Sequence, residues 1–399
     1  MTDWRVYEKR GAEFYKLGDA EGAAQAYFEA ARADTILRKQ REHWSNYIFA
    51  LHYLPQSTAQ NFYDAAQVYN ELYRDVEPLK LLPRKAGKIH VAYLSPSFVE
   101  SSAARFYEAL LTEYDREKFY VTAWDLSERA DSFTVKIQRS VDGYFNISET
   151  SFEEAAQAIR DSGADILFDL GGHTVGGETL EVAAYRPARV QISGVGYFDT
   201  TGLSAIDYFL TDNFLAGSQT KFTEKILAVE NAFAFTPSEK MIRARENLNW
   251  RVKNFAYGCL NNFMKITDGY LSGVKKILAK NPGAKILFRD TTPLESRKNY
   301  LLERIDSAGI ELERVEVRTG ANDFLSDYAE VDLILDTAPY NGGFMTALAI
   351  FMGVAVSTRA GELHHSRIGA DLVRISERGA LFDTKNFVAK VYDKFAEIV

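Results

Sequence analysis

The chain contains two successive runs in which short apolar segments of strand character alternate with segments of helical spacing. The first run predicts strands over 88–94, 119–124 and 164–170, and helices over 102–114 and 152–161. The second begins near Phe255 and predicts strands over 256–260, 285–288, 315–317, 332–336 and 354–358, with helices over 267–280 and 294–308. Such alternation is typical of parallel sheets covered by helices. With a break around 232–250, it predicts an α/β fold of two Rossmann-like lobes that face a cleft and bind ligands at the carboxyl ends of their strands.

The residues before the first run predict helices only. In residues 1–36, small and aromatic side chains recur at helical spacing on both sides of a Gly18-Asp19 turn, namely Gly11, Phe14, Ala23, Tyr27 and Ala30. This pattern predicts one tetratricopeptide-like helical hairpin. A single repeat does not make a solenoid, so we expect the hairpin to cap or dock onto the rest of the chain rather than bind a peptide.

Three further segments complete the expected organisation. Residues 37–86 predict a helical connector that is broken at Leu54-Pro55 and followed by a linker at 82–87. The first α/β lobe then covers residues 87–235, and the second covers residues 236–399.

Charge and cysteine content limit the class of protein. The 399 residues hold 47 Lys and Arg against 55 Asp and Glu, a net charge of −8, without a long basic run. This balance argues against nucleic acid as a partner. A polar N-terminus and the lack of any long apolar window predict a cytoplasmic protein without a membrane span. The single cysteine, Cys259, excludes an internal disulfide, and we expect it to be a buried core residue.

Two glycine-rich loops follow predicted strands. In 169–177, paired glycines flank His173, which either carries a proton or donates a hydrogen bond to a ligand, or orients its own loop. In 336–348, Gly342-Gly343 precedes an apolar helix. Free N–H groups at such a helix start can hold a diphosphate, although the same pair also suits a simple tight turn.

Two other candidates are basic. In 361–369, His364 and His365 are adjacent, and they either contact a ligand or pack at a helix start. Neighbouring residues point apart and no third residue has ligand spacing, so we expect no metal site. Lys265 lies at an apolar strand-to-helix corner, where it either neutralises a diphosphate leaving group or is a solvated surface lysine.

Several blocks along the chain resemble the SPINDLY / O-linked N-acetylglucosamine transferase family, glycosyltransferases in which tetratricopeptide repeats precede a two-lobed GT-B catalytic region. The blocks are residues 165–174, 185–192, 196–203, 206–208, 260–266, 335–343, 364–370 and 380–383, together with 45–46 and 51–53 in the helical connector. Because the likeness covers nearly the whole chain in order, it implies the GT-B fold. The first lobe would face the acceptor and the second the nucleotide-sugar donor.

The resemblance also implies a reaction. It is an inverting, metal-independent transfer of a sugar from a UDP- or GDP-linked donor to a Ser or Thr hydroxyl of a protein, with no other cofactor. Charge that develops on the departing diphosphate must be met by a cation and by N–H groups. Matching the motifs assigns Lys265 as that cation and His173 to the acceptor side. It assigns the donor site to Asn341, Gly342, Gly343, Phe344, Met345, His364, Ser366 and Arg367.

The chain departs from the family pattern at polar positions. Ser101 stands where the family has a histidine near the acceptor, which leaves the neighbouring Glu100 as a candidate acid or base. Phe344, Met345 and Leu348 replace two threonines and the acidic residue that holds the ribose, and Phe324 replaces a nucleotide-side histidine. Only a few positions separate residues 370–374 from 381–383. The family has several tens of residues between the corresponding blocks, so the resemblance implies that the donor lobe is partly trimmed.

These losses keep a second hypothesis open. The protein would then be a catalytically silent homologue that serves as a binding or chaperone subunit for an active glycosyltransferase or for its acceptor protein. Either hypothesis allows an oligomer.

Overall fold

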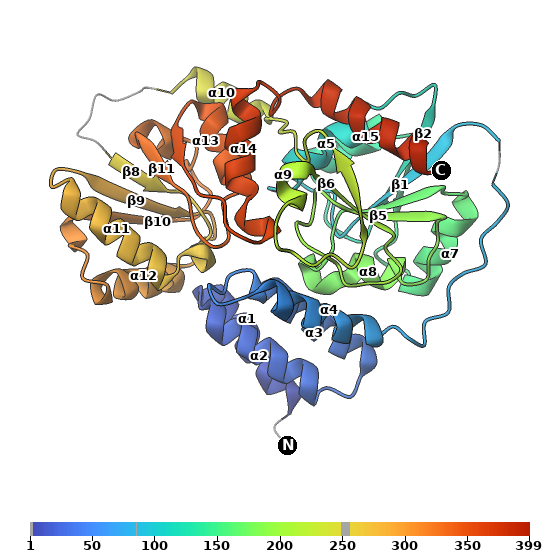
Figure 1. Ribbon diagram of the computed structural model, residues 1–399, viewed down its shortest axis with the longest axis horizontal. Helices are drawn as coiled ribbons and strands as arrows, with labels where there is room; N and C mark the ends of the chain where they lie inside the picture. Colours follow the sequence, from blue (N-terminus) through green and yellow to red (C-terminus); the bar gives the residue numbers. More distant parts are fainter. Residues whose placement is uncertain (1–2, 85, 249–255) are drawn as a thin grey trace.

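The computed structural model describes residues 3–84, 86–248 and 256–399 (Figure 1). Lys85 in the expected linker and Phe255 at the expected start of the second run lie outside these residues. The chain begins with four helices, which lie below the junction of two α/β lobes (Figure 1): α1 (Trp4–Leu17), α2 (Ala20–Ala33), α3 (Leu37–Leu51) and α4 (Ala59–Glu71). The N-terminal helical segment is therefore present, as the sequence predicts.

A close helix contact explains the small residues of the hairpin. A Cβ on Gly11 would stand 2.7 Å from Cε1 of Tyr27, so only glycine lets α1 approach α2 this closely. Gly18 ends α1 with a φ of 95°, a left-handed conformation that glycine adopts without strain. Asp19 then starts α2 by accepting a hydrogen bond from the Gly22 N–H, 2.9 Å away.

The first lobe is built on a seven-stranded parallel sheet. Its strands are β1 (Ile89–Ser95), β2 (Phe119–Asp125), β3 (Gly143–Asn146), β4 (Ile166–Asp169), β5 (Val190–Gly194), β6 (Tyr208–Asp212) and β7 (Lys225–Val229). They are ordered β3-β2-β1-β4-β5-β6-β7. Helices cover both faces: α5 (Ala104–Thr112), α6 (Ser132–Ser140), α7 (Phe152–Ser162), α8 (Glu178–Ala183) and the short α9 (Asn213–Ala216). Val91 of β1 pairs with Val121 on one side and Ile166 on the other, in fully buried positions.

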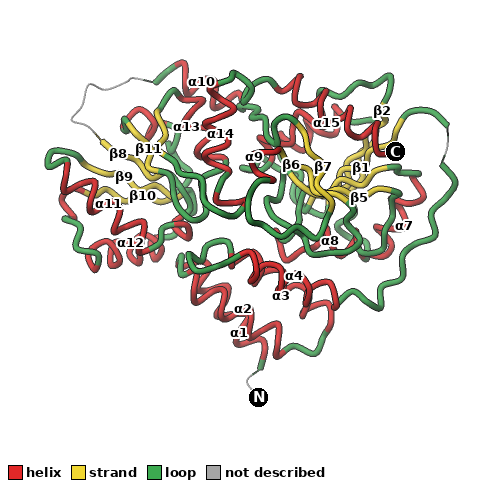
Figure 2. The backbone as a smooth tube through the Cα atoms, viewed as in Figure 1, coloured by secondary structure: helices red, strands yellow, loops and turns green. Residues whose placement is uncertain are grey.

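The second lobe holds a five-stranded parallel sheet ordered β10-β9-β8-β11-β12. The strands are β8 (Ala256–Cys259), β9 (Lys285–Asp290), β10 (Val315–Thr319), β11 (Leu333–Leu335) and β12 (Ala355–Ser357). Its helices are α10 (Glu239–Glu246), α11 (Asp268–Lys280), α12 (Glu295–Ser307), α13 (Phe344–Met352) and α14 (Ile368–Glu377). Figure 2 shows the two sheets as separate groups of strands.

The last helix corrects one boundary. The sequence assigned all residues after 235 to the second lobe, but α15 (Thr384–Ile398) lies over the first sheet (Figure 1). Its Tyr392 hydroxyl donates to the carbonyl of Leu110 at 2.7 Å and accepts from the Tyr93 hydroxyl at 3.0 Å. The chain therefore returns to the first lobe. Only residues 378–383 separate α14 from α15, in keeping with the trimmed donor lobe.

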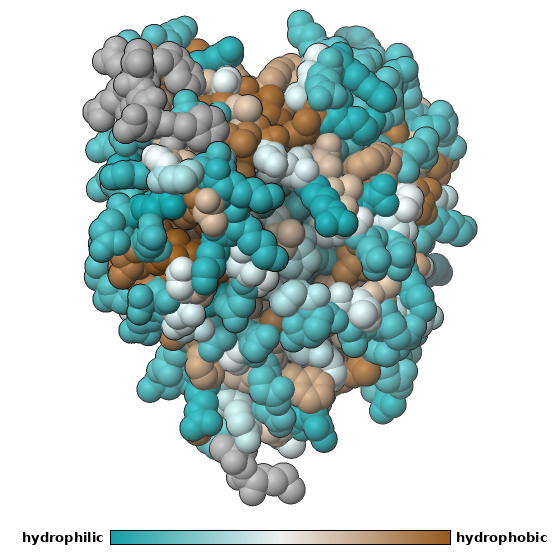
Figure 3. Space-filling view, turned by 60° about the vertical axis from the view of Figure 1, so that its left-hand side comes forward, coloured by the Kyte–Doolittle hydropathy of each residue, from teal (hydrophilic) through white to brown (hydrophobic). Residues whose placement is uncertain are grey.

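The strands and helices predicted for the two runs are present, with ends that differ by a few residues. The sequence did not assign the short strands β3, β5, β6 and β7, nor α6, α8, α10 and α15. Cys259 is fully buried, as predicted, and burial raises the pKa of its thiol to about 12. The face turned forward in Figure 3 is mostly hydrophilic, with hydrophobic residues gathered near its top. None of the described helices has the length and apolar character needed to cross a membrane.

Candidate functional site

Strand order determines where a ligand can bind. In each sheet the order reverses beside the first strand of the lobe, between β1 and β4 in one and between β8 and β11 in the other. Loops that leave the carboxyl ends at such a switch point diverge and open a crevice. Three of the loops selected from the sequence follow β4, β8 and β11, so they lie at these two crevices.

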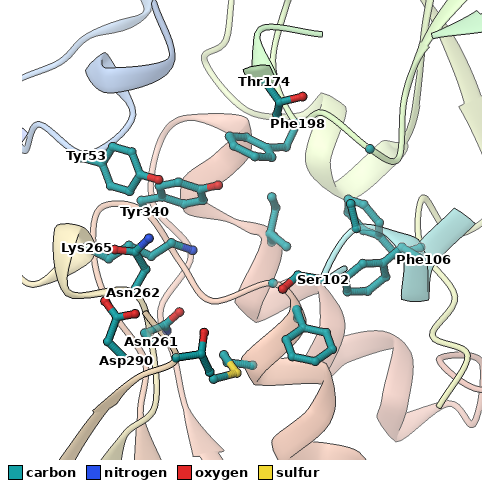
Figure 4. A pocket seen from close by; sticks show the side chains of 18 of the residues that line it. Tyr53, Ser102, Phe106, Thr174, Phe198, Asn261, Asn262, Lys265, Asp290 and Tyr340 are labelled. Carbon is teal, nitrogen blue, oxygen red and sulfur yellow. The ribbon is translucent and has the colours of Figure 1, made fainter. Parts of the chain in front are cut away.

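A cavity of about 340 Å³ lies between the lobes at these strand ends (Figure 4). The helical connector contributes Tyr53. The first lobe contributes Ser102, Ala103, Phe106, Thr174, Val195, Gly196, Phe198 and Phe233. The second lobe contributes Asn261, Asn262, Lys265, Asp290, Thr291, Thr292, Tyr340, Gly343, Phe344, Met345 and Ile368. All three parts of the chain thus meet at one site.

Lys265 is the cation of this cavity. It ends the 3₁₀ turn η2 (Phe263–Lys265) after β8, and it is only 9% exposed. Its Nζ donates to the carbonyl of Asn341 at 2.8 Å and lies 3.6 Å from the centre of the Tyr340 ring. Burial lowers the pKa of Lys265 to about 8, against the attraction of Asp336. Lys265 is therefore a partly desolvated ammonium group inside the cavity and not a solvated surface lysine.

Asp336 shapes the glycine turn that follows β11. Its Oδ1 accepts from the Gly342 N–H at 2.7 Å and from the Thr337 N–H at 2.9 Å, and its Oδ2 accepts from the Thr358 hydroxyl at 2.7 Å. The Asn341 side chain donates to the Thr337 carbonyl at 2.8 Å. Burial raises the pKa of Asp336 to about 6, so the carboxylate is ionised at neutral pH. Asn341 and Gly342 thus form the frame of the turn rather than the cavity wall.

The start of α13 faces the cavity directly. Gly343 is its N-cap residue and has no side chain that could cap the first N–H groups. Gly343, Phe344 and Met345 all line the cavity. The N-terminus of a helix carries unpaired N–H groups and a partial positive charge, which suits an anion. The site therefore joins Lys265 to a helix N-terminus on one wall.

The opposite wall is apolar and aromatic. Figure 4 shows Phe106 across the cavity from Lys265, Phe198 at the upper side of the cavity, and Tyr340 beside Lys265. The rings of Phe198 and Tyr340 lie 4.9 Å apart, and those of Tyr53 and Tyr340 lie 5.2 Å apart. The helical connector thereby takes part in the cavity through Tyr53.

His173 does not line the cavity. Its Nε2 donates to the carbonyl of Thr201 at 2.8 Å, and its Nδ1 accepts from the Ser45 hydroxyl at 2.9 Å. Burial lowers its pKa to about 3. The structure therefore places His173 where it orients its loop and ties α3 to the first lobe, which was the alternative interpretation of this residue.

Glu100 also lies outside the cavity lining. Its carboxylate forms an ion pair with Arg105 at 3.1 Å and is about half exposed, while its N–H donates to Asp131 at 2.8 Å. Burial raises the pKa of Glu100 despite Arg105. Its neighbour Ser102 contributes to the cavity instead.

The donor-side residues of 364–367 contact the first lobe rather than the cavity. The His364 ring hydrogen-bonds the Thr211 hydroxyl at 2.9 Å, and burial lowers its pKa to about 4. Ser366 closes its own turn by donating to the Leu363 carbonyl at 2.7 Å. Arg367 donates to the Gly217 carbonyl at 2.9 Å. His364 and Arg367 join the lobes, and none of the three residues lines the cavity. Of the predicted set, the structure therefore brings together only Lys265, Gly343, Phe344 and Met345.

Sequence reasoning missed several residues of the site. Asn261, Asn262 and Tyr340 lie within blocks that were singled out, and Asp290 lies two residues after the predicted strand 285–288, so their position at strand ends could have identified them. Phe198 and Tyr53 also lie within such blocks, 196–203 and 51–53, whereas Phe106 carried no local signal. The sequence showed no second ligand residue near His365. In the structure, His365 lies beside His52 and Asp199, and Asp199 is 166 residues away in sequence.

Comparison with known proteins agrees with this arrangement. The model of Glycosyl transferase family 41 matches residues 74–252. A probable UDP-N-acetylglucosamine–peptide N-acetylglucosaminyltransferase SPINDLY from Hordeum vulgare is 27% identical over 369 residues, which is 88% of this chain and 38% of that protein. The corresponding protein SEC from Arabidopsis thaliana is 23% identical over 303 residues, 71% of this chain and 30% of its own length. The chain thus spans well under half of these curated relatives.

Among solved structures, an O-GlcNAc transferase of Thermobaculum terrenum superposes with a TM-score of 0.87 at 21% identity, covering 98% of this chain and 83% of that one. This likeness establishes the GT-B fold for the two lobes and their helical preface. The sequence matches confirm the resemblance drawn from the motifs: the chain is similar to the SPINDLY / O-linked N-acetylglucosamine transferase glycosyltransferases.

Proposed function

We propose that this protein transfers a sugar from a nucleotide-diphosphate donor to a Ser or Thr hydroxyl of a protein, by inversion and without a metal ion in the reaction. The observation that carries the proposal is the junction of Lys265 with the α13 N-terminus at one wall of the interlobe cavity. The relatives named above are described as transferring N-acetylglucosamine from UDP to peptides.

The electrostatics of the wall suit a diphosphate leaving group. A buried ammonium group interacts more strongly with an anion than a solvated one does, because little water competes with it. Gly343, Phe344 and Met345 at the start of α13 line the same space, and a helix N-terminus that is already formed needs no reorganisation when charge develops. Asp336 accepts a hydrogen bond from the backbone of the turn at Gly342, and Lys265 donates to the carbonyl of Asn341 in the same turn. Lys265 and the start of α13 are therefore held in a fixed relative position.

The opposite wall would receive the acceptor. Ser102 and Thr174 border it, and Phe106 and Phe198 provide apolar surface for an extended segment of a protein. The family resemblance likewise assigns the acceptor to the first lobe.

A second function has its own support. Among the described residues that line the cavity, the one carboxylate is Asp290, which is paired with Arg297, and none is a histidine. A general base for the hydroxyl is thus not evident in the wall. This favours the alternative of a silent homologue that binds an active glycosyltransferase or its acceptor protein.

Two measurements distinguish the functions. Purified protein is incubated with a panel of labelled UDP- and GDP-sugars and with protein from its own cells, and in parallel titrated calorimetrically with UDP and with GDP. Saturable binding together with transfer supports the enzyme, and Lys265→Met should then reduce turnover about a hundredfold or more. Saturable binding without turnover supports the silent homologue. If neither nucleotide binds and no donor is consumed, the enzyme proposal is wrong.

A further inference from the structure

Three buried side chains from three parts of the chain converge beside the cavity. His52 follows the end of α3 in the helical connector, Asp199 lies in the loop after β5, and His365 lies in the 3₁₀ turn η5 (His364–Ser366) before α14. The side chains of all three are at most 1% exposed. Their meeting point is therefore the junction of the helical segment with both lobes.

The three donor atoms are as close as ligands of one ion. The Asp199 Oδ2 lies 3.2 Å from Nδ1 of His365 and 3.4 Å from Nε2 of His52. All three atoms lie within 4.8 Å of one another. Ligand atoms that bind one zinc ion at about 2.0–2.2 Å each stand at separations of this order, so small side-chain shifts would bring them into place.

One ring nitrogen of His52 is buried near the carboxylate and has no hydrogen-bond partner. Nδ1 of His52 lies 3.1 Å from the carbonyl of Phe49, which can only accept, so Nδ1 carries the proton. The other ring nitrogen, Nε2, is buried without a hydrogen-bond partner and is the atom that lies 3.4 Å from Asp199 Oδ2. A metal-binding histidine commonly has this arrangement, with its second nitrogen donating to a backbone carbonyl.

The charge of the cluster also needs a cation. Asp199 is fully buried, and its other carboxylate oxygen, Oδ1, accepts from the Thr200 N–H at 2.8 Å. Within the described part of the chain, no arginine or lysine is paired with Asp199. A buried carboxylate without a paired charge is costly, and a bound cation removes that cost.

We propose that His52, Asp199 and His365 form a site for one zinc ion that joins the helical segment to both lobes. Two imidazole nitrogens and one carboxylate oxygen are a ligand set that suits zinc, with a solvent molecule in the fourth position. His365 would bind through Nδ1 as the neutral tautomer that carries its proton on Nε2. The site is separate from the proposed sugar transfer, because none of the three residues lines the cavity, but the neighbours Tyr53 and Phe198 do. The ion would thus fix that wall of the cavity.

The test uses the full chain without a polyhistidine tag, first stripped with a chelator and then titrated with Zn²⁺. We expect one zinc ion per chain by elemental analysis and a melting temperature that rises with zinc concentration, since the ion binds the folded state. His365→Asn should weaken zinc binding by a hundredfold or more, because even loss of a residue that only supports a ligand costs about 10–100-fold. Asp199→Asn should act in the same direction.

His43→Asn is the matched control. His43 is also buried, with Nε2 3.2 Å from the Asp34 carboxylate, but no third ligand completes that pair within the described residues. This variant should bind zinc as the unchanged protein does. If the site variants fail to fold, Co²⁺ added to the unchanged protein should give visible absorption bands of tetrahedral Co²⁺, displaced by one equivalent of Zn²⁺. Substoichiometric zinc, equal binding by His365→Asn, or no such bands would overturn the proposal, whatever the outcome for sugar transfer.

Discussion

Arg297 and Asp290 form a buried ion pair between the helical hairpin and the cavity. Nη1 of Arg297 lies 2.8 Å from Oδ2 of Asp290, and both side chains are 2% exposed. The same guanidinium donates to the carbonyls of Tyr15 at 2.7 Å and Lys16 at 3.1 Å, in the last turn of α1. A cation at this end of a helix meets carbonyls without helical partners. Because Asp290 lines the cavity, the hairpin is linked to the site by one arginine.

Replacing this arginine should be strongly destabilising. Arg297→Met leaves Asp290 buried without its partner and frees the carbonyls of α1, so we expect the free energy of unfolding to fall by about 3–5 kcal/mol. Urea denaturation measures the change. Adding Asp290→Asn to this variant should recover part of the loss, since the unpaired charge is then removed.

Arg304→Met on the same helix is the control. Arg304 pairs with Asp268, whose side chain is 90% exposed, so its loss should cost about 0–1 kcal/mol. If the free energy of unfolding falls equally in the two arginine variants, burial of the Arg297–Asp290 pair does not increase the cost of breaking it.

The two adjacent glycines should respond differently to the same substitution. A Cβ on Gly342 would overlap Thr346 and stand 2.9 Å from both the Asn261 side-chain nitrogen and Asp336 Oδ1, so Gly342→Ala should destabilise the fold by about 1–3 kcal/mol. A Cβ on Gly343 would find its nearest neighbour, a methyl group of Ile368, 4.0 Å away. Gly343→Ala should keep its stability and weaken nucleotide binding, because the methyl group enters the cavity. Thermal melts and titration with UDP and GDP separate the two effects. If Gly343→Ala binds nucleotide unchanged, the start of α13 does not hold the diphosphate.

Nucleotide binding should depend on pH through Lys265. Its pKa of about 8 means that the ammonium form dominates below pH 8 and is lost above it, so affinity should fall about tenfold from pH 7 to pH 9. Asp336, with a pKa of about 6, stays ionised across this range and adds no change. Calorimetric titration at the two pH values tests this, and Lys265→Arg, which remains charged, should abolish the dependence. The exposed Lys276→Met on α11 should behave as the unchanged protein. An unaltered pH profile in Lys265→Arg would contradict the assignment.

His173 should contribute to acid sensitivity. Its pKa falls from an ordinary value near 6.5 in the unfolded chain to about 3 in the fold, so the unfolded state binds the proton first, and stability is lost as pH drops from 6.5 towards 3. By pH 5 this loss amounts to about 2 kcal/mol. The variant His173→Gln cannot take up this proton. The amount by which its free energy of unfolding falls below that of the unchanged protein should therefore be about 2 kcal/mol smaller at pH 5 than at pH 7.5. Urea unfolding at both pH values measures this difference in stability. If the difference is the same at both, His173 takes up the proton as readily in the folded state as in the unfolded state.

The sequence by itself determined the two parallel sheets, the helical preface and the strand ends at which a site can form. These follow from local properties: the spacing of apolar residues within a strand or helix, and the conformations that Gly18 or Gly342-Gly343 allow. Lys265 could be selected in the same way, because its apolar corner follows a predicted strand and the strand order then places it at a switch point.

Only the tertiary structure decided where the other side chains point. His173 and His364 carry the same local signal as Lys265, but hydrogen bonds to Thr201 and Thr211 turn them away from the cavity. The return of α15 to the first sheet and the meeting of His52 with Asp199 and His365 join segments far apart in the chain. Such contacts depend on how whole elements pack against one another, and no pattern within a short window of sequence encodes that packing.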